Sequence, residues 1–147
     1  MFKGKKVTII GGGKMGGILA QGLIHHKIIP ARDVCVTDID AARLRFLQSS
    51  LKIKTSSDNK QAVSESDIVI LAVKPQNMAA TLEEIKSSVD KFNVVISIAA
   101  GITTKFIEAR LGKGIRVVRV MPNTPALVGE GTAAVAAGRH AKANDVR

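Results

Sequence analysis

A glycine pattern directly after an apolar run is the feature that most constrains how this chain can fold. Residues 6–10, "KVTII", are followed by "GGGKMGG", which places Gly11, Gly13 and Gly16 in a Gly-x-Gly-x-x-Gly spacing. Apolar residues then recur at helical spacing over residues 15–26. A strand, a glycine turn and a helix in this order are typical of the phosphate-binding turn of a dinucleotide-binding fold. A purely structural glycine turn is the alternative.

Short apolar runs and amphipathic segments alternate along the rest of the chain, which predicts an α/β fold. The expected strands are residues 6–10, 33–38, 53–55, 67–73, 93–101, 115–120 and 132–138, and the expected helices between them are 15–26, 41–50, 59–66, 77–89 and 103–111. This alternation predicts βαβ units and a Rossmann-type, doubly wound, mainly parallel sheet with helices on both faces. Asp40, Asn77 and Thr103 are expected to cap helices. One domain is expected over residues 1–147, with 139–147 as the start of a truncated helical segment.

The composition of the chain indicates which kinds of ligand and which surroundings suit it. The chain has 147 residues, a net charge of +10, no Trp or Tyr and four Phe, so aromatic platforms for stacking nucleic-acid bases are scarce. Its basic residues are spread out, which fits a solvated basic surface or the attraction of a small phosphorylated ligand. No apolar run reaches the length of about 18 residues of a membrane span. Cys35 is expected to be a buried, unreactive thiol in a cytoplasmic protein.

Each glycine of the pattern has a predicted task. Gly11 would make the tight turn, Gly13 would let the backbone approach a pyrophosphate, and Gly16 would let helix and strand pack closely. The free N–H groups and the positive dipole end at the helix start attract phosphate.

An acidic residue ends the second predicted strand. Asp38 lies 22 positions after Gly16 and is expected to accept hydrogen bonds from the adenosine ribose of NAD, or else to share helix capping with Asp40. No arginine follows Asp38 at once, yet Arg43, Arg45 and Lys14 are close enough in sequence to reach the 2′-phosphate of NADP. The residues therefore do not decide whether the cofactor is NAD or NADP.

Two more strand ends belong to the expected site, because ligands of open parallel sheets bind outside the carboxyl ends of the strands. The segments "LAVKPQN" (71–77) and "SIAAG" (97–101) hold small residues that leave room for a flat ring and a ribose. Lys74 is either a cation beside the cofactor or an ordinary solvated lysine.

Four segments in this order resemble the pyrroline-5-carboxylate reductase family: "IGGGKMGG", "DIVILAVKPQ", "SIAAGIT" and "RVMPNTPALVGEG". The resemblance implies hydride transfer from NADPH or NADH to the C=N carbon of 1-pyrroline-5-carboxylate, which gives proline in the last step of its biosynthesis. The family more often uses NADPH, commonly with an arginine or serine-type partner near the end of the second strand, and "TDID" departs from that pattern. The cofactor contacts implied are Ile10, Gly11, Gly12, Gly13, Lys14, Met15, Gly16, Asp38, Asn59, Ala72, Val73, Lys74, Pro75, Ala99, Ala100 and Gly101. A helix cap explains Asn59 equally well.

The segment 119–131 is the most specific part of the resemblance. Pro122 and Pro125 restrict the backbone on either side of Asn123 and Thr124. The residues Met121, Asn123, Thr124 and Pro125 are therefore expected near the substrate, with a plain structural turn as the alternative. No catalytic side chain is assigned, no metal site is expected, and the three histidines are expected at the surface.

Members of the family continue beyond this length as a helical domain, which makes a dimer and supplies much of the substrate pocket. The resemblance thus implies an isolated cofactor domain that binds a dinucleotide without efficient turnover, in a full-length homodimer or higher oligomer that binds neither nucleic acid nor membrane. Two alternatives stay open: another NAD(P)-dependent reductase of the hydroxyacid dehydrogenase-like superfamily, and a non-enzymatic nucleotide-sensing Rossmann module.

Overall fold

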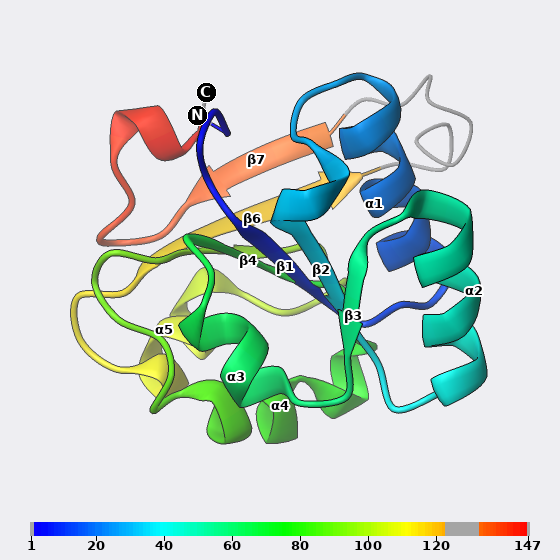
Figure 1. The fold of residues 1–147 in the computed structure, drawn as a ribbon. Helices are drawn as coiled ribbons and strands as arrows, with labels where there is room; N and C mark the ends of the chain where they lie inside the picture. Colours follow the sequence, from blue (N-terminus) through cyan, green and yellow to red (C-terminus); the bar gives the residue numbers. More distant parts are fainter. Residues whose placement is uncertain (1, 123–132, 147) are drawn as a thin grey trace.

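One seven-stranded sheet runs through the molecule (Figure 1). The computed structural model describes residues 2–122 and 133–146. The strands are β1 Val7–Ile10, β2 Val34–Thr37, β3 Lys54–Ser56, β4 Ile68–Leu71, β5 Val94–Ser97, β6 Arg116–Pro122 and β7 Ala133–Ala137. They lie in the order β3-β2-β1-β4-β5-β6-β7; the first six pair in parallel and β7 pairs antiparallel to β6. The predicted mainly parallel sheet is confirmed.

Helices cover both faces of the sheet, as the alternation predicted. They are α1 Lys14–His25, α2 Ala41–Leu51, α3 Asn59–Ser64, α4 Met78–Ile85 and α5 Thr104–Leu111, with short 3-10 turns η1 Ala31–Asp33, η2 Pro75–Asn77 and η4 Ala143–Asp145. In Figure 1, α1 and α2 lie together on one side of the sheet, and α3, α4 and α5 lie on the other.

The side chains of β4 show why this strand is apolar at every position. Ile68 and Ile70 belong to the core that includes α1 and α2, whereas Val69 and Leu71 belong to the core beneath α3, α4 and α5. Because successive side chains of a strand point to opposite faces, a strand covered on both faces must be apolar throughout.

The helix starts follow local capping chemistry. The Asp40 carboxylate accepts the backbone N–H of Ala42 at 3.0 Å and so caps α2, and Thr103 caps α5 as predicted. The cap of α3 is Asp58 rather than Asn59, which is the first residue of the helix. Asn77 stands at the start of α4, but its side chain makes no capping hydrogen bond.

Two predicted helices are shorter in the structure. α4 ends at Ile85, although Val89, the next apolar residue of its predicted face, is buried as well. The turn that follows α4 carries Val89 into the core without helical geometry. The spacing of apolar residues therefore predicted a longer helix than the structure has. In the segment 139–146 the structure has only the single turn η4.

The surface position expected for the histidines is confirmed. His25, His26 and His140 are all exposed. Within the part of the chain that the structure describes, no helix combines the length and apolar character needed to cross a membrane.

Candidate dinucleotide-binding site

The parallel register brings the predicted strand ends to one edge of the sheet. Ile10, the last residue of β1, pairs with Thr37 of β2 on one side and with Leu71 of β4 on the other, and Leu71 pairs with Ser97 of β5. The residues that follow these strands therefore leave the sheet side by side. Between β1 and β4 the strand order reverses, which is where ligands bind in open α/β sheets.

The glycine turn has the backbone shape that its spacing predicted. Gly11 has φ +103°, and a Cβ there would lie 2.6 Å from the carbonyl oxygen of Ala72 on the neighbouring strand end. A Cβ on Gly16 would overlap the carbonyl oxygen of Gly11. The first glycine thus permits the turn, and the third lets α1 lie directly against it.

The start of α1 is open to an incoming group. Gly13 is the N-cap residue; it is exposed, makes no side-chain cap, and has nothing within 4 Å of where a Cβ would be. No acidic residue lies in the first turn of α1. A 12-residue helix that begins this way presents free N–H groups and the positive end of its dipole, so the site fits a diphosphate.

Asp38 is joined to the glycine turn itself. Its Oδ2 accepts the N–H of Gly12 at 2.7 Å, and its Oδ1 accepts the N–H of Asp40 at 2.9 Å. The carboxylate does not cap α2, because Asp40 performs that task alone. The ribose role of Asp38 stays a prediction.

Arg43 also reaches the turn, a contact that was not foreseen. From the first turn of α2, its Nε donates to the carbonyl of Gly12 at 2.5 Å and its Nη2 to that of Gly13 at 3.4 Å. The guanidinium also lies over the ring of Phe46, 5.2 Å from its centroid. The sequence signal for it was an arginine just after the helix cap, which predicted nearness to a phosphate but not a bond to the turn.

The remaining predicted contacts lie at the ends of β4, β5 and β6. After β4, Ala72 and Val73 are half-buried, and Lys74 and Pro75 are exposed. After β5, Ala99 is buried, and Ala100 and Gly101 are exposed. On β6, Met121 is half-buried. Asn123, Thr124 and Pro125 lie outside the described residues. Asn59 donates from Nδ2 to Glu84 Oε2 at 3.2 Å, so in this structure it links α3 to α4.

One other chemically interesting group, the thiol of Cys35, lies within β2 and away from this edge of the sheet. Burial raises the pKa of the half-buried Cys35 thiol, and the nearby Glu65 carboxylate adds to the rise while Lys54 opposes it. Among residues 2–122 and 133–146, no three His, Cys, Asp or Glu side chains gather as a metal site requires.

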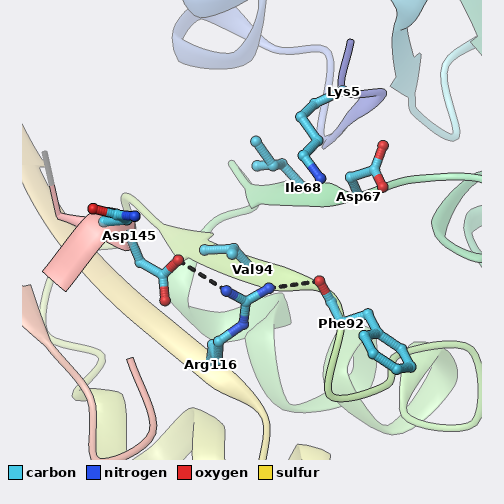
Figure 2. A pocket seen from close by; sticks show the side chains of 8 residues that line it. Lys5, Asp67, Ile68, Phe92, Val94, Arg116 and Asp145 are labelled. Carbon is cyan, nitrogen blue, oxygen red and sulfur yellow. Dashed lines mark hydrogen bonds and ion pairs between the residues drawn. The ribbon is translucent and has the colours of Figure 1, made fainter. Parts of the chain in front are cut away.

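A hollow of about 440 Å³ opens at the opposite, amino edge of the sheet (Figure 2). Arg116 crosses it and donates to Asp145 Oδ1 at 3.0 Å and to the carbonyl of Phe92 at 2.7 Å. This pair joins the start of β6 to η4, near the end of the chain. We interpret it as a structural anchor, since the glycine turn lies at the other edge.

Comparisons with known proteins identify relatives of this chain. A family model described as "NADP oxidoreductase coenzyme F420-dependent" matches residues 6–101. The pyrroline-5-carboxylate reductase of Methanosarcina acetivorans is 41% identical over 146 residues, which cover 99% of this chain and 54% of that protein. Pyrroline-5-carboxylate reductase 1 of Bacillus subtilis is 36% identical over 141 residues, which cover 95% of this chain and 48% of that protein.

Solved structures show the same likeness. A pyrroline-5-carboxylate reductase from Coxiella burnetii superposes with a TM-score of 0.89 at 37% identity, covering 95% of this chain and 52% of that one. The Plasmodium falciparum pyrroline carboxylate reductase, solved with NADP bound, gives a TM-score of 0.85 at 28% identity, covering 99% and 52%. The chain spans about half the length of these relatives. It belongs to the NADP oxidoreductase, coenzyme F420-dependent family, and its relatives include pyrroline-5-carboxylate reductases.

Proposed function

We propose that this chain is the dinucleotide-binding half of a pyrroline-5-carboxylate reductase, which passes a hydride to the C=N carbon of 1-pyrroline-5-carboxylate and so forms proline. The observation that carries the proposal is the glycine turn. It opens the start of α1 at the edge where β1, β2, β4 and β5 end. The identity of 41% to the Methanosarcina acetivorans reductase supports this substrate over that of another reductase.

Each part of the edge has a proposed task. The N–H groups at Gly13 and Lys14 hold the diphosphate, and the end of β2 at Asp38 lies beside the adenosine ribose. The small residues of 72–75 and 99–101 line the path of the nicotinamide. The bound cofactor supplies the hydride, so the chain contributes position and electrostatics, and the imine nitrogen takes its proton from a donor or from solvent.

NADPH is the proposed donor rather than NADH. The matched family's description names NADP, and the Plasmodium falciparum relative was solved with NADP bound. The cationic side chains beside the glycine turn are compatible with the extra phosphate.

Substrate recognition is proposed to be shared between two halves of a longer protein. From this chain, Met121, Asn123, Thr124 and Pro125 would face the imino acid. The other groups, and the contacts of a dimer, would come from a second half, because the relatives are about twice as long as this chain.

A chimera tests the proposal. Residues 1–147 replace the matching half of the Methanosarcina acetivorans reductase, and NADPH oxidation is followed with and without 1-pyrroline-5-carboxylate. We expect imine-dependent oxidation by the chimera, and binding of NADPH without turnover by residues 1–147 alone. A folded chimera that binds NADPH but leaves the imine unreduced, beside an active parent enzyme, would contradict the proposed function.

A further inference from the structure

The hollow at the amino edge of the sheet has charged walls and an apolar floor (Figure 2). Lys5 and Asp67, which precede β1 and β4, form one wall, and Arg116 at the start of β6 forms the opposite one. Ile68 of β4 and Val94 of β5 lie between the walls, because β4 and β5 separate β1 from β6 in the sheet. A ligand in the hollow would therefore meet charge at its sides and apolar carbon beneath it.

The wall of Arg116 is occupied by its own contacts. The guanidinium donates to Asp145 and to the carbonyl of Phe92, and Asp145 also accepts the N–H of Lys142. The two charges neutralise each other at this wall. It therefore limits the size of the hollow without selecting the charge of a ligand.

Lys5 has no such partner. Its side chain is exposed, and no ion pair within the described residues includes it. Figure 2 shows its ammonium group directed toward Ile68 in the hollow. Because an ammonium group has three N–H donors and no acceptor, it bonds best to an anion. The hollow thus presents a cation that a carboxylate can reach.

Asp67 is fixed near Lys5 by the backbone of the residue between them. Its Oδ2 accepts the N–H of Lys6 at 2.8 Å, and its own N–H donates to the carbonyl of Lys6 at 2.9 Å. These two bonds join the start of β4 to the start of β1. They use only one oxygen of the carboxylate, so Oδ1 is left to accept a hydrogen bond from a ligand.

The balance of charge indicates a zwitterionic ligand. Two cationic and two acidic side chains line the hollow, so a phosphate or another simple anion finds no excess of positive charge there. Lys5 and Asp67 have opposite charges, yet the ion pairs of the described residues do not include one between them. An α-amino acid carries a carboxylate and an ammonium group on one carbon, and one molecule can satisfy both residues. Its side chain would then cover Ile68 and Val94, which favours an apolar one.

We propose that the hollow at the amino edge binds a small apolar α-amino acid as its zwitterion, with the carboxylate on Lys5 and the ammonium group on Asp67. The volume of about 440 Å³ admits such a molecule together with water. The inference stands on the hollow and does not require a dinucleotide on the glycine turn. Under the proposed function the product, proline, belongs to this class of ligand, so L-proline is the probe.

Titration of L-proline into the isotope-labelled chain, without dinucleotide and with the backbone amides followed by NMR, tests the inference. We expect saturable shifts at Asp67, Ile68, Val94 and Asn144, with a dissociation constant of roughly millimolar order, as suits a ligand of few atoms. Two analogues divide the zwitterion. Cyclopentanecarboxylate keeps the ring and the carboxylate, whereas pyrrolidine keeps the ring and the ammonium group. Each should bind at least about tenfold more weakly than L-proline, because one charged hydrogen bond is lost.

Variants locate the two charged contacts. Lys5→Gln and Asp67→Asn should each weaken L-proline binding by about tenfold, and the asparagine keeps an oxygen for the N–H of Lys6. Lys113→Gln and Asp90→Asn are the matched controls, since both residues are exposed in the loops that enter β6 and β5 and neither lines the hollow. They should change the affinity by less than about twofold, because solvent screens their charges.

No saturable shift at the hollow would overturn the inference. Shifts confined to residues 72–74 and 99–101 would overturn it too, because the amino acid would then bind at the dinucleotide edge. Cyclopentanecarboxylate that binds as tightly as L-proline would show a simple anion site, and equal losses in the control variants would show unspecific attraction; either result refutes the zwitterion site.

Two further outcomes are also decisive. If Asp67→Asn unfolds, Lys5→Gln decides alone, because Lys5 is exposed and its loss should leave the fold intact. A chain that binds NADPH but not L-proline refutes this inference and leaves the proposed function standing. A chain that binds L-proline at the hollow but no NADPH refutes the proposed function instead.

Discussion

The amide nitrogen of Gly12 lies 2.7 Å from Oδ2 of Asp38, so the glycine turn after β1 is tied to the end of β2. The sequence pattern predicted this acid as a ligand for ribose or as a second cap of the following helix. In the structure it already holds a backbone N–H of the phosphate-binding turn, and its second oxygen holds the N–H of Asp40. The acid thus connects the two segments that a dinucleotide must bridge.

Replacing this acid should cost stability as well as affinity. Asp38→Ala leaves two backbone N–H groups without their acceptor, and we expect the free energy of unfolding to fall by about 1–3 kcal/mol. Asp38→Asn keeps one acceptor oxygen and should lose less. Denaturant unfolding gives the numbers, and an Asp38→Ala variant as stable as wild type would show that the tie carries no stability.

Replacing either of two glycines of α1 by alanine should change the free energy of unfolding, and the two changes should have opposite signs. At Gly16 the added methyl overlaps the carbonyl of Gly11, so we expect Gly16→Ala to lower the free energy of unfolding by about 1–3 kcal/mol and to weaken dinucleotide binding. At Gly22 no atom lies within 4 Å of the new methyl. Gly22→Ala, the matched control, should raise stability by roughly 0.5–1 kcal/mol through helix propensity. Similar effects at both sites would contradict the packing assigned to Gly16.

The ion pair between Arg116 and Asp145 at the amino edge should contribute far more to the free energy of unfolding than a surface ion pair does. The side chains of Arg116 and Asp145 are 18% and 5% exposed, and Asp145 also accepts the N–H of Lys142 at 2.7 Å. Removing one buried partner costs about 3–5 kcal/mol, and we expect the lower end for Asp145→Ala because Arg116 is partly exposed. The exposed pair Lys86–Glu83 is the control, and Glu83→Gln should cost less than about 1 kcal/mol.

Dinucleotide affinity distinguishes this anchor from the site. Because the pair lies at the other edge of the sheet, an Asp145→Ala protein that remains folded should bind NADPH as wild type does. A large loss of affinity at unchanged fold would show that the amino edge takes part in the binding.

Cys35 should make stability depend on pH in the alkaline range. Burial raises the pKa of this thiol in the folded protein above its ordinary value, so folding favours the neutral form. Its contribution is fully present below the ordinary pKa and is lost as pH rises toward the folded pKa, by up to about 1.4 kcal/mol per pH unit. Cys35→Ser removes the titration. The difference in unfolding free energy between wild type and Cys35→Ser, measured from neutral to alkaline pH, should therefore shift against wild type; a constant difference would contradict the raised pKa.

Local chemistry explains which features the sequence predicted well. The strand, glycine turn and α1 were predictable because the positive φ of Gly11 and the close approach of Gly16 to Gly11 are local features. The buried strand β4 was predictable because it is apolar at all four positions. The C-terminal end of α4 and the N-cap residue of α3 were harder to predict from the sequence. Val89 continues the apolar spacing of α4 although it lies beyond the helix, and Asp58 and Asn59 are both good caps in sequence.

Contacts between distant segments were beyond the sequence. Arg43 is 31 positions from Gly12, and its place against the turn depends on how α1 and α2 pack. Asp145 is 29 positions from Arg116 and meets it only after the chain returns along β7. No periodicity or spacing encodes such pairs, so a single sequence indicates the residue types present but not their partners.

The central claim is that the glycine turn of this chain holds a nicotinamide dinucleotide. Titrating NADPH into the isotope-labelled chain while following its backbone amides by NMR tests this most directly. We predict saturable shifts that are largest at Gly12, Gly13, Lys14 and Met15, smaller ones at 72–74 and 99–101, and none around Arg116 and Asp145. Unchanged amides at the glycine turn under saturating NADPH, or shifts confined to the amino edge, would contradict the account.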